Sequence, residues 1–245
     1  MDGTRLDGRV AVVTGAAGAI GAAIARDLTA LGGRVVIADV DLAGAREVAG
    51  GLPGARAMPL DLASPASVEE FANAVERADI LVHNAGVAVV EPFVEGDPAG
   101  WDLMWRVNLR GPMLLTKLLL PGMMERAWGR LVFVSSDGAR AGSGGEGAYA
   151  ATKAGLFGLA KTLAREAARA HVTSNVVCPG PVDTPMLHRV ADAEPGLVDK
   201  IVRGIPLRRL GTPADVAGLV AYLCTERAAY ITGQTLSVSG GVTMH

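Results

Sequence analysis

The chain has 245 residues, half of them hydrophobic, and a formal net charge of -2. This length supports one large hydrophobic core and is too short for two full domains. Lys and Arg are scattered singly or in pairs, so the sequence predicts no basic surface and no nucleic-acid partner.

Cysteine usage and the apolar runs restrict the class of protein further. Cys178 and Cys224 are too few for a disulfide framework, and no Cys/His spacing suits a metal. The segment Met1–Arg9 has no apolar stretch typical of a signal peptide. The longest apolar run, Met113–Leu120, is interrupted by Lys117 and is too short to span a bilayer. We expect a soluble, cytoplasmic protein without a membrane partner.

Short β-branched runs alternate with longer helical patterns along the chain. Strands are predicted at Val10–Thr14, Arg34–Ala38, Ala55–Leu60, Asp79–Val82, Gly129–Ser135, Thr173–Val177 and Thr235–Val238. Helices are predicted at Ala19–Leu31, Leu42–Gly50, from Ser64-Pro65 onward, at Trp101–Ala127 and Tyr149–Ala170, and from the capping sequence at Thr212 to Asp215 onward.

This alternation predicts an α/β fold of the Rossmann type. Strands that are apolar along their whole length indicate a parallel sheet covered on both faces. We expect one domain over residues 1–245, with about seven strands in a doubly wound sheet and helices on both faces. Ligands bind such sheets beyond the carboxyl ends of the strands, near the reversal of strand order.

A glycine-rich turn follows the first predicted strand. Its sequence is Thr14-Gly15-Ala16-Ala17-Gly18-Ala19-Ile20-Gly21, and a helix is predicted to begin within it. Glycines let a pyrophosphate approach the backbone N–H groups of a helix N-terminus. The turn therefore predicts a dinucleotide site that includes Gly15, Ala17, Gly18 and Ile20, although glycines at 15 and 18 are also compatible with a purely structural turn.

Polar residues at the following strand ends extend this predicted site. Asp39 ends the second strand, where a carboxylate accepts hydrogen bonds from ribose hydroxyls and repels a 2′-phosphate, so NAD is favoured over NADP. Asp61 and Leu62 are placed for the adenine edge, and the segment Asn84-Ala85-Gly86 lies where backbone approaches the ribose. Asp39 as a surface turn residue and Asp61 as a helix-capping residue are the alternatives.

Tyr149 and Lys153 lie four residues apart on a predicted helix and so share one face. A neighbouring ammonium and an oxidised nicotinamide lower a phenol pKa, which would let Tyr149 exchange a proton with an alcohol oxygen. Ser136, at the end of the fifth strand, is placed to hydrogen-bond that oxygen. A Tyr-x-x-x-Lys pair alone is common on helix surfaces.

Seven motifs follow one another along the chain. They are the glycine turn, Asp39, Asn84-Ala85-Gly86, Asn108, Ser136, the Tyr149/Lys153 pair and Pro179-Gly180. In this order they resemble the short-chain dehydrogenase/reductase family. The resemblance covers nearly the whole chain. It implies a proton-transferring Tyr149, a Lys153 that binds the nicotinamide ribose and lowers the tyrosine pKa, a substrate-binding Ser136, and an Asn108 that holds a relay water. It also implies that Pro179, Gly180, Val182 and Thr184 contact the nicotinamide end of the cofactor.

The chain departs from the family pattern at two places. His83 stands where the family usually has an asparagine, and we interpret it as a packing residue at a strand end. The segment from Ser64 to Asp79 is short, so its helix should be truncated. Neither departure affects the four predicted catalytic residues.

Three loops beyond the strand ends, at residues 87–96, 137–147 and 185–204, are placed to select the substrate. The third is a predicted lid, whose His188, Arg189, Lys200 and Arg203 either meet an anionic group such as a coenzyme A phosphate or are simply solvated. Finer similarity in segments 135–155, 175–187 and 231–241 resembles the 2-hydroxycyclohexanecarboxyl-CoA dehydrogenase branch. A 3-oxoacyl (carrier protein or CoA) reductase, a cyclic-alcohol or sugar-alcohol dehydrogenase, and a non-catalytic NAD-binding regulator are the alternatives.

The long apolar-striped helices at Trp101–Ala127 and Tyr149–Ala170 would leave apolar faces exposed in a monomer. In the family these helices pair across a two-fold axis. The expected assembly is therefore a homotetramer, with a dimer as the alternative.

Overall fold

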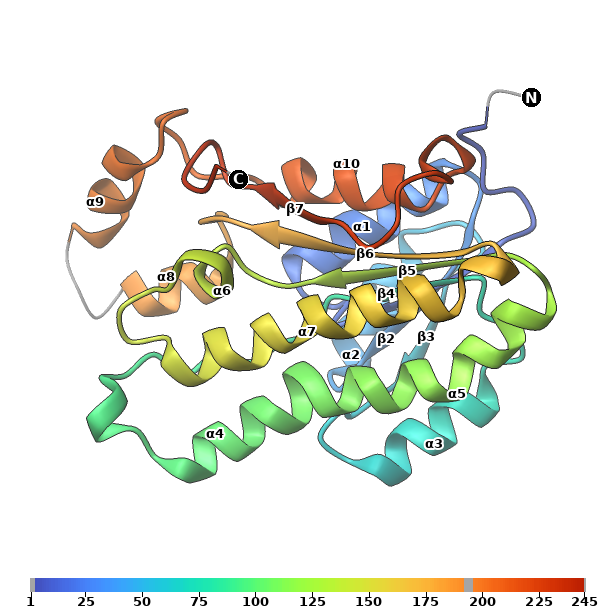
Figure 1. The fold of residues 1–245 in the computed structure, drawn as a ribbon, viewed down its shortest axis with the longest axis horizontal. Coiled ribbons are helices and arrows are strands. Elements are labelled where there is room, and N and C mark those ends of the chain that lie inside the picture. The colour runs from blue at the N-terminus through green and yellow to red at the C-terminus, as the bar shows by residue number, and fades with distance from the viewer. Residues whose placement is uncertain (1–2, 192–195, 245) are drawn as a thin grey trace.

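A computed structural model describes residues 3–191 and 196–244, and it contains one seven-stranded parallel sheet in the order β3-β2-β1-β4-β5-β6-β7 (Figure 1). The strands are β1 (Val10–Thr14), β2 (Arg34–Asp39), β3 (Arg56–Pro59), β4 (Ile80–His83), β5 (Gly129–Val134), β6 (Val172–Pro179) and β7 (Thr235–Val238). The main helices are α1 (Ala19–Ala30), α2 (Leu42–Gly50), α3 (Pro65–Ala74), α4 (Pro98–Trp105), α5 (Gly111–Glu125), α6 (Gly138–Ala141), α7 (Gly147–Glu166), α8 (Pro185–Ala191), α9 (Leu197–Gly204) and α10 (Pro213–Leu223). The predicted α/β class and doubly wound sheet are confirmed.

The sheet reverses its strand order at β1. Strands β2 and β3 lie on one side of β1 and β4 to β7 lie on the other, with Val13 of β1 paired to Ile37 of β2 and to Val82 of β4. The connections leaving the carboxyl ends of β1 and β4 therefore diverge. This divergence opens the crevice where ligands bind in folds of this type.

Alternate residues of each strand enter two separate hydrophobic layers, one on each face of the sheet. Val13 packs in one layer with Ile24 of α1 and Val216 of α10. Val12 packs in the other layer with Leu115 of α5 and Leu156 of α7. Figure 1 shows α5 and α7 side by side across one face, with α1 and α10 on the opposite side. This continuous burial explains why the strands read as unbroken apolar runs.

The predicted helix at Trp101–Ala127 is wrong as one continuous α-helix. The structure begins α4 at Pro98 and inserts a π-helical segment, Arg106–Arg110, before α5. Pro112 has no N–H and cannot complete the α-helical hydrogen bond to the carbonyl of Asn108, four residues earlier. The proline therefore favours local rewinding at Asn108.

The other predicted boundaries differ by a few residues. Helix α7 ends at Glu166 and a separate 3₁₀ turn covers Ala168–Ala170, whereas one helix is predicted to Ala170. After Ser64, α3 runs for 10 residues and ends at Ala74. The predicted lid contains α8 and α9, while its residues 192–195 and the side chain of Arg189 lie outside the described residues.

Across residues 3–191 and 196–244, no helix combines the length and apolar character needed to cross a membrane. The same part of the chain contains no group of three His, Cys, Asp or Glu side chains arranged to hold a metal ion.

Candidate active site

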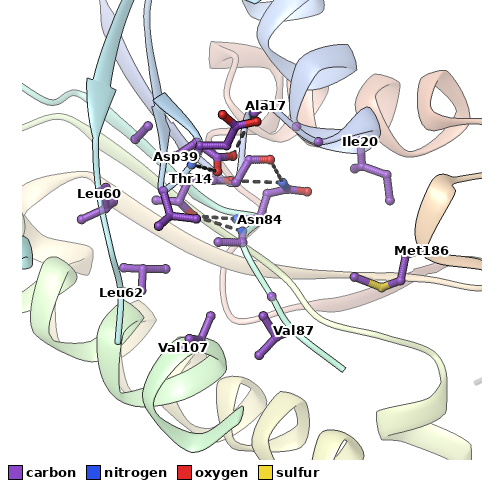
Figure 2. Close-up of a pocket in the computed structure, with 18 of the residues that line it drawn as sticks. Thr14, Ala17, Ile20, Asp39, Leu60, Leu62, Asn84, Val87, Val107 and Met186 are labelled. Carbon is purple, nitrogen blue, oxygen red and sulfur yellow. Dashed lines mark hydrogen bonds between the residues drawn. The ribbon is translucent and has the colours of Figure 1, made fainter. Parts of the chain in front are cut away.

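A cleft of about 480 Å³ lies at the carboxyl ends of β1 to β4, at the N-terminus of α1 (Figure 2). Most of the predicted cofactor-binding residues line it. They are Gly15, Ala17, Gly18, Ile20, Asp39, Asp61, Leu62, Asn84, Ala85, Gly86 and Thr184. Sequence positions separated by up to 169 residues thus meet at the reversal of the sheet, as the fold class predicts.

Thr14 and Asn84 fasten the two diverging strand ends to each other. The Thr14 hydroxyl accepts hydrogen bonds from the backbone N–H groups of Asn84 and Ala85, both at 3.1 Å. The Asn84 amide donates to the carbonyl oxygens of Thr14 at 3.1 Å and Gly15 at 3.0 Å. Figure 2 shows these bonds in the floor of the cleft. The side chain of Asn84 therefore holds the shape of the glycine turn.

Gly15 occupies a position that only glycine fits. Its φ is +63°, and a Cβ atom there would lie 2.6 Å from the Cα atom of Ala85. The N-cap residue of α1, Gly18, makes no side-chain cap, so the first N–H groups of the helix face the cleft without a side-chain acceptor. Such a helix N-terminus stabilises a pyrophosphate.

Carboxylates also line the cleft, one of them directly beside the glycine turn. Asp39 accepts hydrogen bonds from the N–H of Ala17 at 2.9 Å and of Asp41 at 3.0 Å. Asp61 accepts from Ala63 N–H at 2.8 Å, so it forms the turn before α3 and lines the cleft as well. In the described part of the chain, no Lys or Arg lines this cleft.

Ser136 and Tyr149 meet beyond the end of β5, and Lys153 follows Tyr149 by one turn of α7. The largely buried Tyr149 hydroxyl is hydrogen-bonded to Ser136. Lys153 is 3% exposed, and its ammonium donates to the carbonyl oxygens of Val134 at 3.0 Å and Ala85 at 3.5 Å. Lys153 thus joins the catalytic cluster to the segment that lines the cleft.

Burial changes both titrating groups in the direction that favours their neutral forms. It raises the pKa of Tyr149 to about 12, with a further contribution from the negative charge of Glu146 and an opposing one from the Ser136 hydrogen bond. It lowers the pKa of Lys153 to about 8. The predicted depression of the Tyr149 pKa is therefore not produced by the protein's own groups. A cationic nicotinamide against the phenol is the remaining source of that depression.

Asn108 is fully buried within the π-helical segment. Its amide exchanges two hydrogen bonds of 2.9 Å with the backbone of Val87 and donates a third, of 3.2 Å, to the Thr152 hydroxyl. The side chain therefore clamps the β4 loop against α7. The carbonyl of Asn108 cannot accept an α-helical hydrogen bond from Pro112, which has no N–H.

The remaining predicted contacts lie at the carboxyl end of β6. Gly180 donates to Val238 at 3.0 Å, Pro179 accepts from Asp137 at 2.9 Å, and Val182 bridges to Gly211. Thr184 is the one of the four predicted residues in this stretch that lines the cleft. The structure thus places Pro179, Gly180 and Val182 at the correct sheet edge but outside the cleft wall.

Several residues that line the cleft are not predicted from the sequence as cofactor-binding residues. Val40 is 73% exposed, and it lines the cleft together with Val107 and Met186. Only Met186 had a signal, its place in the predicted lid. Exposed valine and methionine side chains carry no chemical pattern that a single sequence reveals.

His83 packs within the sheet, as interpreted from the sequence. It is 1% exposed, stacks on Phe133 with ring centroids 4.8 Å apart, and is hydrogen-bonded through Nε2 to the Thr116 hydroxyl at 2.8 Å. Burial, with the charge of Lys153, lowers the pKa of His83 to about 3. The ring is therefore neutral at physiological pH.

Known proteins are similar to this chain in sequence and fold over almost their full lengths. A family described as enoyl-(acyl carrier protein) reductase matches residues 15–243. The 3-oxoacyl-(acyl-carrier-protein) reductase FabG of Aquifex aeolicus is 37% identical over 247 residues, 97% of this chain and 98% of its own. The 2,3-dihydroxy-2,3-dihydro-p-cumate dehydrogenase of Pseudomonas putida is 38% identical over 248 residues, 98% of this chain and 96% of its own.

A solved structure from Beutenbergia cavernae, described as a candidate NAD(P)-dependent gluconate 5-dehydrogenase with NADP at low occupancy, is also similar. It is 33% identical, covers 98% of both chains and has a TM-score of 0.92. The matches extend over the cleft, the catalytic cluster and the sheet together. This chain belongs to the short-chain dehydrogenase/reductase family of oxidoreductases.

Proposed function

We propose that this protein interconverts a secondary alcohol and a ketone with NAD, using Tyr149 as general acid and base. The observation that carries the proposal is the hydrogen bond between the Tyr149 hydroxyl and Ser136, with the buried Lys153 one turn later on α7. The Lys153 ammonium is bonded to the carbonyl of Ala85, which lines the cleft. In this arrangement one oxygen of the substrate can bond both hydroxyls. Intact Ser136, Tyr149 and Lys153 disfavour a non-catalytic NAD-binding regulator.

The proton chemistry belongs to the chain's own residues. In alcohol oxidation Tyr149 takes the hydroxyl proton, and in ketone reduction it returns one. Ser136 holds the substrate oxygen as charge develops on it. Lys153, fixed by its hydrogen bonds to Val134 and Ala85, would hold the nicotinamide ribose, as the family resemblance implies. The nicotinamide, when bound, accepts or delivers the hydride.

We propose NAD rather than NADP as the cofactor. The cleft fits a dinucleotide because the start of α1, which has no side-chain cap, lines it together with the Asp39 carboxylate. A 2′-phosphate at Asp39 would meet negative charge and, among the lining residues that the structure describes, no basic side chain. The relative with bound NADP makes this preference worth measuring directly.

The substrate candidates differ in whether they carry a thioester. A cyclic hydroxyacyl-CoA is suggested by the branch resemblance, a 3-oxoacyl thioester by the Aquifex relative, and a ring or sugar alcohol by the dihydrodiol and gluconate relatives. The proposed lid begins with α8, since Pro185 and Met186 at its start line the cleft together with Thr184.

We propose a homotetramer, with a dimer as the alternative. The support is a set of exposed apolar side chains along α4 and α5. They are Leu103, Trp105, Met113, Leu118 and Met124. Size-exclusion chromatography with light scattering tests this assembly, and a monomeric protein at micromolar concentration would contradict it.

The activity is tested by following NADH absorbance with a panel of cyclic alcohols, ketones, sugar alcohols and CoA thioesters. We expect turnover by the wild type and a loss of about 10²–10⁴-fold in kcat with Tyr149→Phe, because a general acid and base contributes that factor. Calorimetric NAD affinity serves as the folding control and should change little. A wild type that binds NAD and turns over no member of the panel would contradict the proposal.

A further inference from the structure

The glycine-rich loop before α7 contributes one acidic side chain to the catalytic cluster. Glu146 is the N-cap residue of α7, yet its side chain makes no capping hydrogen bond. It is half-buried and accepts a hydrogen bond from the Ser143 hydroxyl. No salt bridge to Glu146 is found within residues 3–191 and 196–244. The carboxylate thus keeps acceptor capacity that neither helix capping nor a salt bridge uses.

Gly138 makes room for this carboxylate beside Ser136. A Cβ atom on Gly138 would lie 2.7 Å from Glu146 Oε2 and 3.4 Å from Ser136 Oγ. The two oxygens therefore flank the same small space. Glu146 also lies three residues before Tyr149 on the face of α7 that carries the phenol, and its charge contributes to the raised pKa of Tyr149.

We infer that Glu146 is a specificity-determining residue that accepts a hydrogen bond from a second hydroxyl of the substrate, on the carbon next to the reacting one. This inference rests on the proposed function, because it places the reacting oxygen at Ser136 and Tyr149. Because Glu146 Oε2 and Ser136 Oγ both lie close to Gly138, an oxygen on the adjacent carbon of the substrate comes within reach of the carboxylate.

The chemistry of a carboxylate selects among the substrate classes. An ionised carboxylate only accepts hydrogen bonds, so it favours a neighbouring O–H. In a 3-oxoacyl thioester or a cyclic hydroxyacyl-CoA of the kind considered above, the carbons next to the reacting one carry no hydroxyl, so these substrates offer Glu146 no donor. The inferred substrates are therefore vicinal diols and hydroxyketones rather than acyl thioesters.

The test compares cis-1,2-cyclohexanediol with cyclohexanol, which lacks only the second hydroxyl. With NAD and the wild type we expect kcat/KM to favour the diol at least tenfold, because a hydrogen bond to a charged group is worth about 1.5–3 kcal/mol. Glu146→Ala should lower kcat/KM for the diol at least tenfold more than for cyclohexanol and so remove this preference. Glu146→Gln should retain part of the preference through its amide oxygen.

Two glycine substitutions distinguish an effect of moving the Glu146 carboxylate from an effect of stiffening the loop. Gly138→Ala would displace the Glu146 carboxylate, whereas Gly144→Ala, in the same loop, meets nothing within 4 Å. We expect loss of diol preference with the first and none with the second. Equal turnover of both alcohols by the wild type, or an equal loss on both with Glu146→Ala, would overturn the inference. Tighter use of 2-aminocyclohexanol than of the diol would overturn it as well, in favour of a cationic substrate.

A binding measurement keeps the two proposals distinguishable. Ligand-observed NMR titration of the NAD complex with each alcohol needs no turnover. Diol-selective binding that Glu146→Ala abolishes, without any hydride transfer, would sustain the role of Glu146 while contradicting the proposed activity. Activity on other alcohols with no diol preference in binding or turnover would contradict the role of Glu146 alone.

Discussion

The carboxylate of Asp39 accepts a hydrogen bond of 2.9 Å from the backbone N–H of Ala17, and both residues line the cleft. One side chain thus ties the end of β2 to the glycine turn after β1. The bond uses one carboxylate oxygen and fixes its orientation. Further lone pairs of Asp39 remain available to ribose hydroxyls at the cleft surface.

Replacing Asp39 should therefore change which cofactor is preferred. We expect Asp39→Ala to lower the ratio of kcat/KM for NAD over NADP by about 10- to 100-fold, since it removes charged hydrogen bonds to the ribose and repulsion of a 2′-phosphate. Steady-state kinetics with both cofactors measures the ratio. Asp41→Asn is the matched control for nearby charge, because Asp41 lines the same cleft and the amide oxygen can still cap α2. An equal shift in both variants would show a general charge effect instead.

Gly15 should tolerate no side chain. Gly15→Ala forces a Cβ into the left-handed region and against Ala85, so we expect a loss of about 1–3 kcal/mol in the free energy of unfolding and at least tenfold weaker NAD binding. Gly50→Ala is the control, since a Cβ there meets nothing within 4 Å at the end of α2. Urea unfolding and calorimetry measure the two effects. Unchanged cofactor affinity in Gly15→Ala would contradict the assigned role of the turn.

Much of the fold and cleft could be predicted because the signals are local. A buried apolar run predicts a strand, and the glycines or the Asp39 that follow it predict that the carboxyl end of this strand binds a ligand. Strand order needs only the general rules of doubly wound sheets. The structure then confirms that Gly15, Asp39 and Asn84 meet at one place.

The rest depends on contacts between distant segments. The π-helical segment at Asn108 competes with a strong helical pattern, and only the missing N–H of Pro112 signals it. The direction of Glu146 follows from the space above Gly138, which no periodicity describes. The pKa of Tyr149 reflects burial, and the depth of burial emerges only when α7 packs on the sheet.

His83 should make stability depend on pH in the acidic range. Its pKa is about 3 in the folded chain against 6.5 for the free side chain, so the unfolded state binds a proton first as pH falls. The free energy of unfolding should drop by about 2 kcal/mol between pH 6.5 and pH 5 from this residue alone.

The variant His83→Asn cannot titrate there and should show a correspondingly flatter pH profile in urea unfolding. His171→Asn is the control, because His171 is exposed and has φ 55°, a conformation that asparagine tolerates. If His83→Asn followed the wild-type slope between pH 6.5 and pH 5, His83 would not be the titrating group.

The buried charge of Lys153 should lower the free energy of unfolding of the protein. Its pKa is about 8 when folded against 10.5 when free, so the ionised form is disfavoured by burial at neutral pH. Each pKa unit corresponds to about 1.4 kcal/mol of destabilisation of the charged form. The hydrogen bonds from the ammonium to Val134 and Ala85 offset part of this destabilisation. We expect Lys153→Met to raise the free energy of unfolding by about 1–2 kcal/mol at pH 7 while greatly lowering kcat.

The pH dependence identifies the cause of that gain. Below pH 8 Lys153 is charged in both states and the gain should be full. It should shrink as pH rises from 8 to 10.5, because the folded wild type then releases its proton first. Urea unfolding at pH 7 and pH 9.5 measures the difference, with Lys161→Met, an exposed position on the same helix, as the matched control. A gain independent of pH would assign the stabilisation to packing of the methionine rather than to the removed charge.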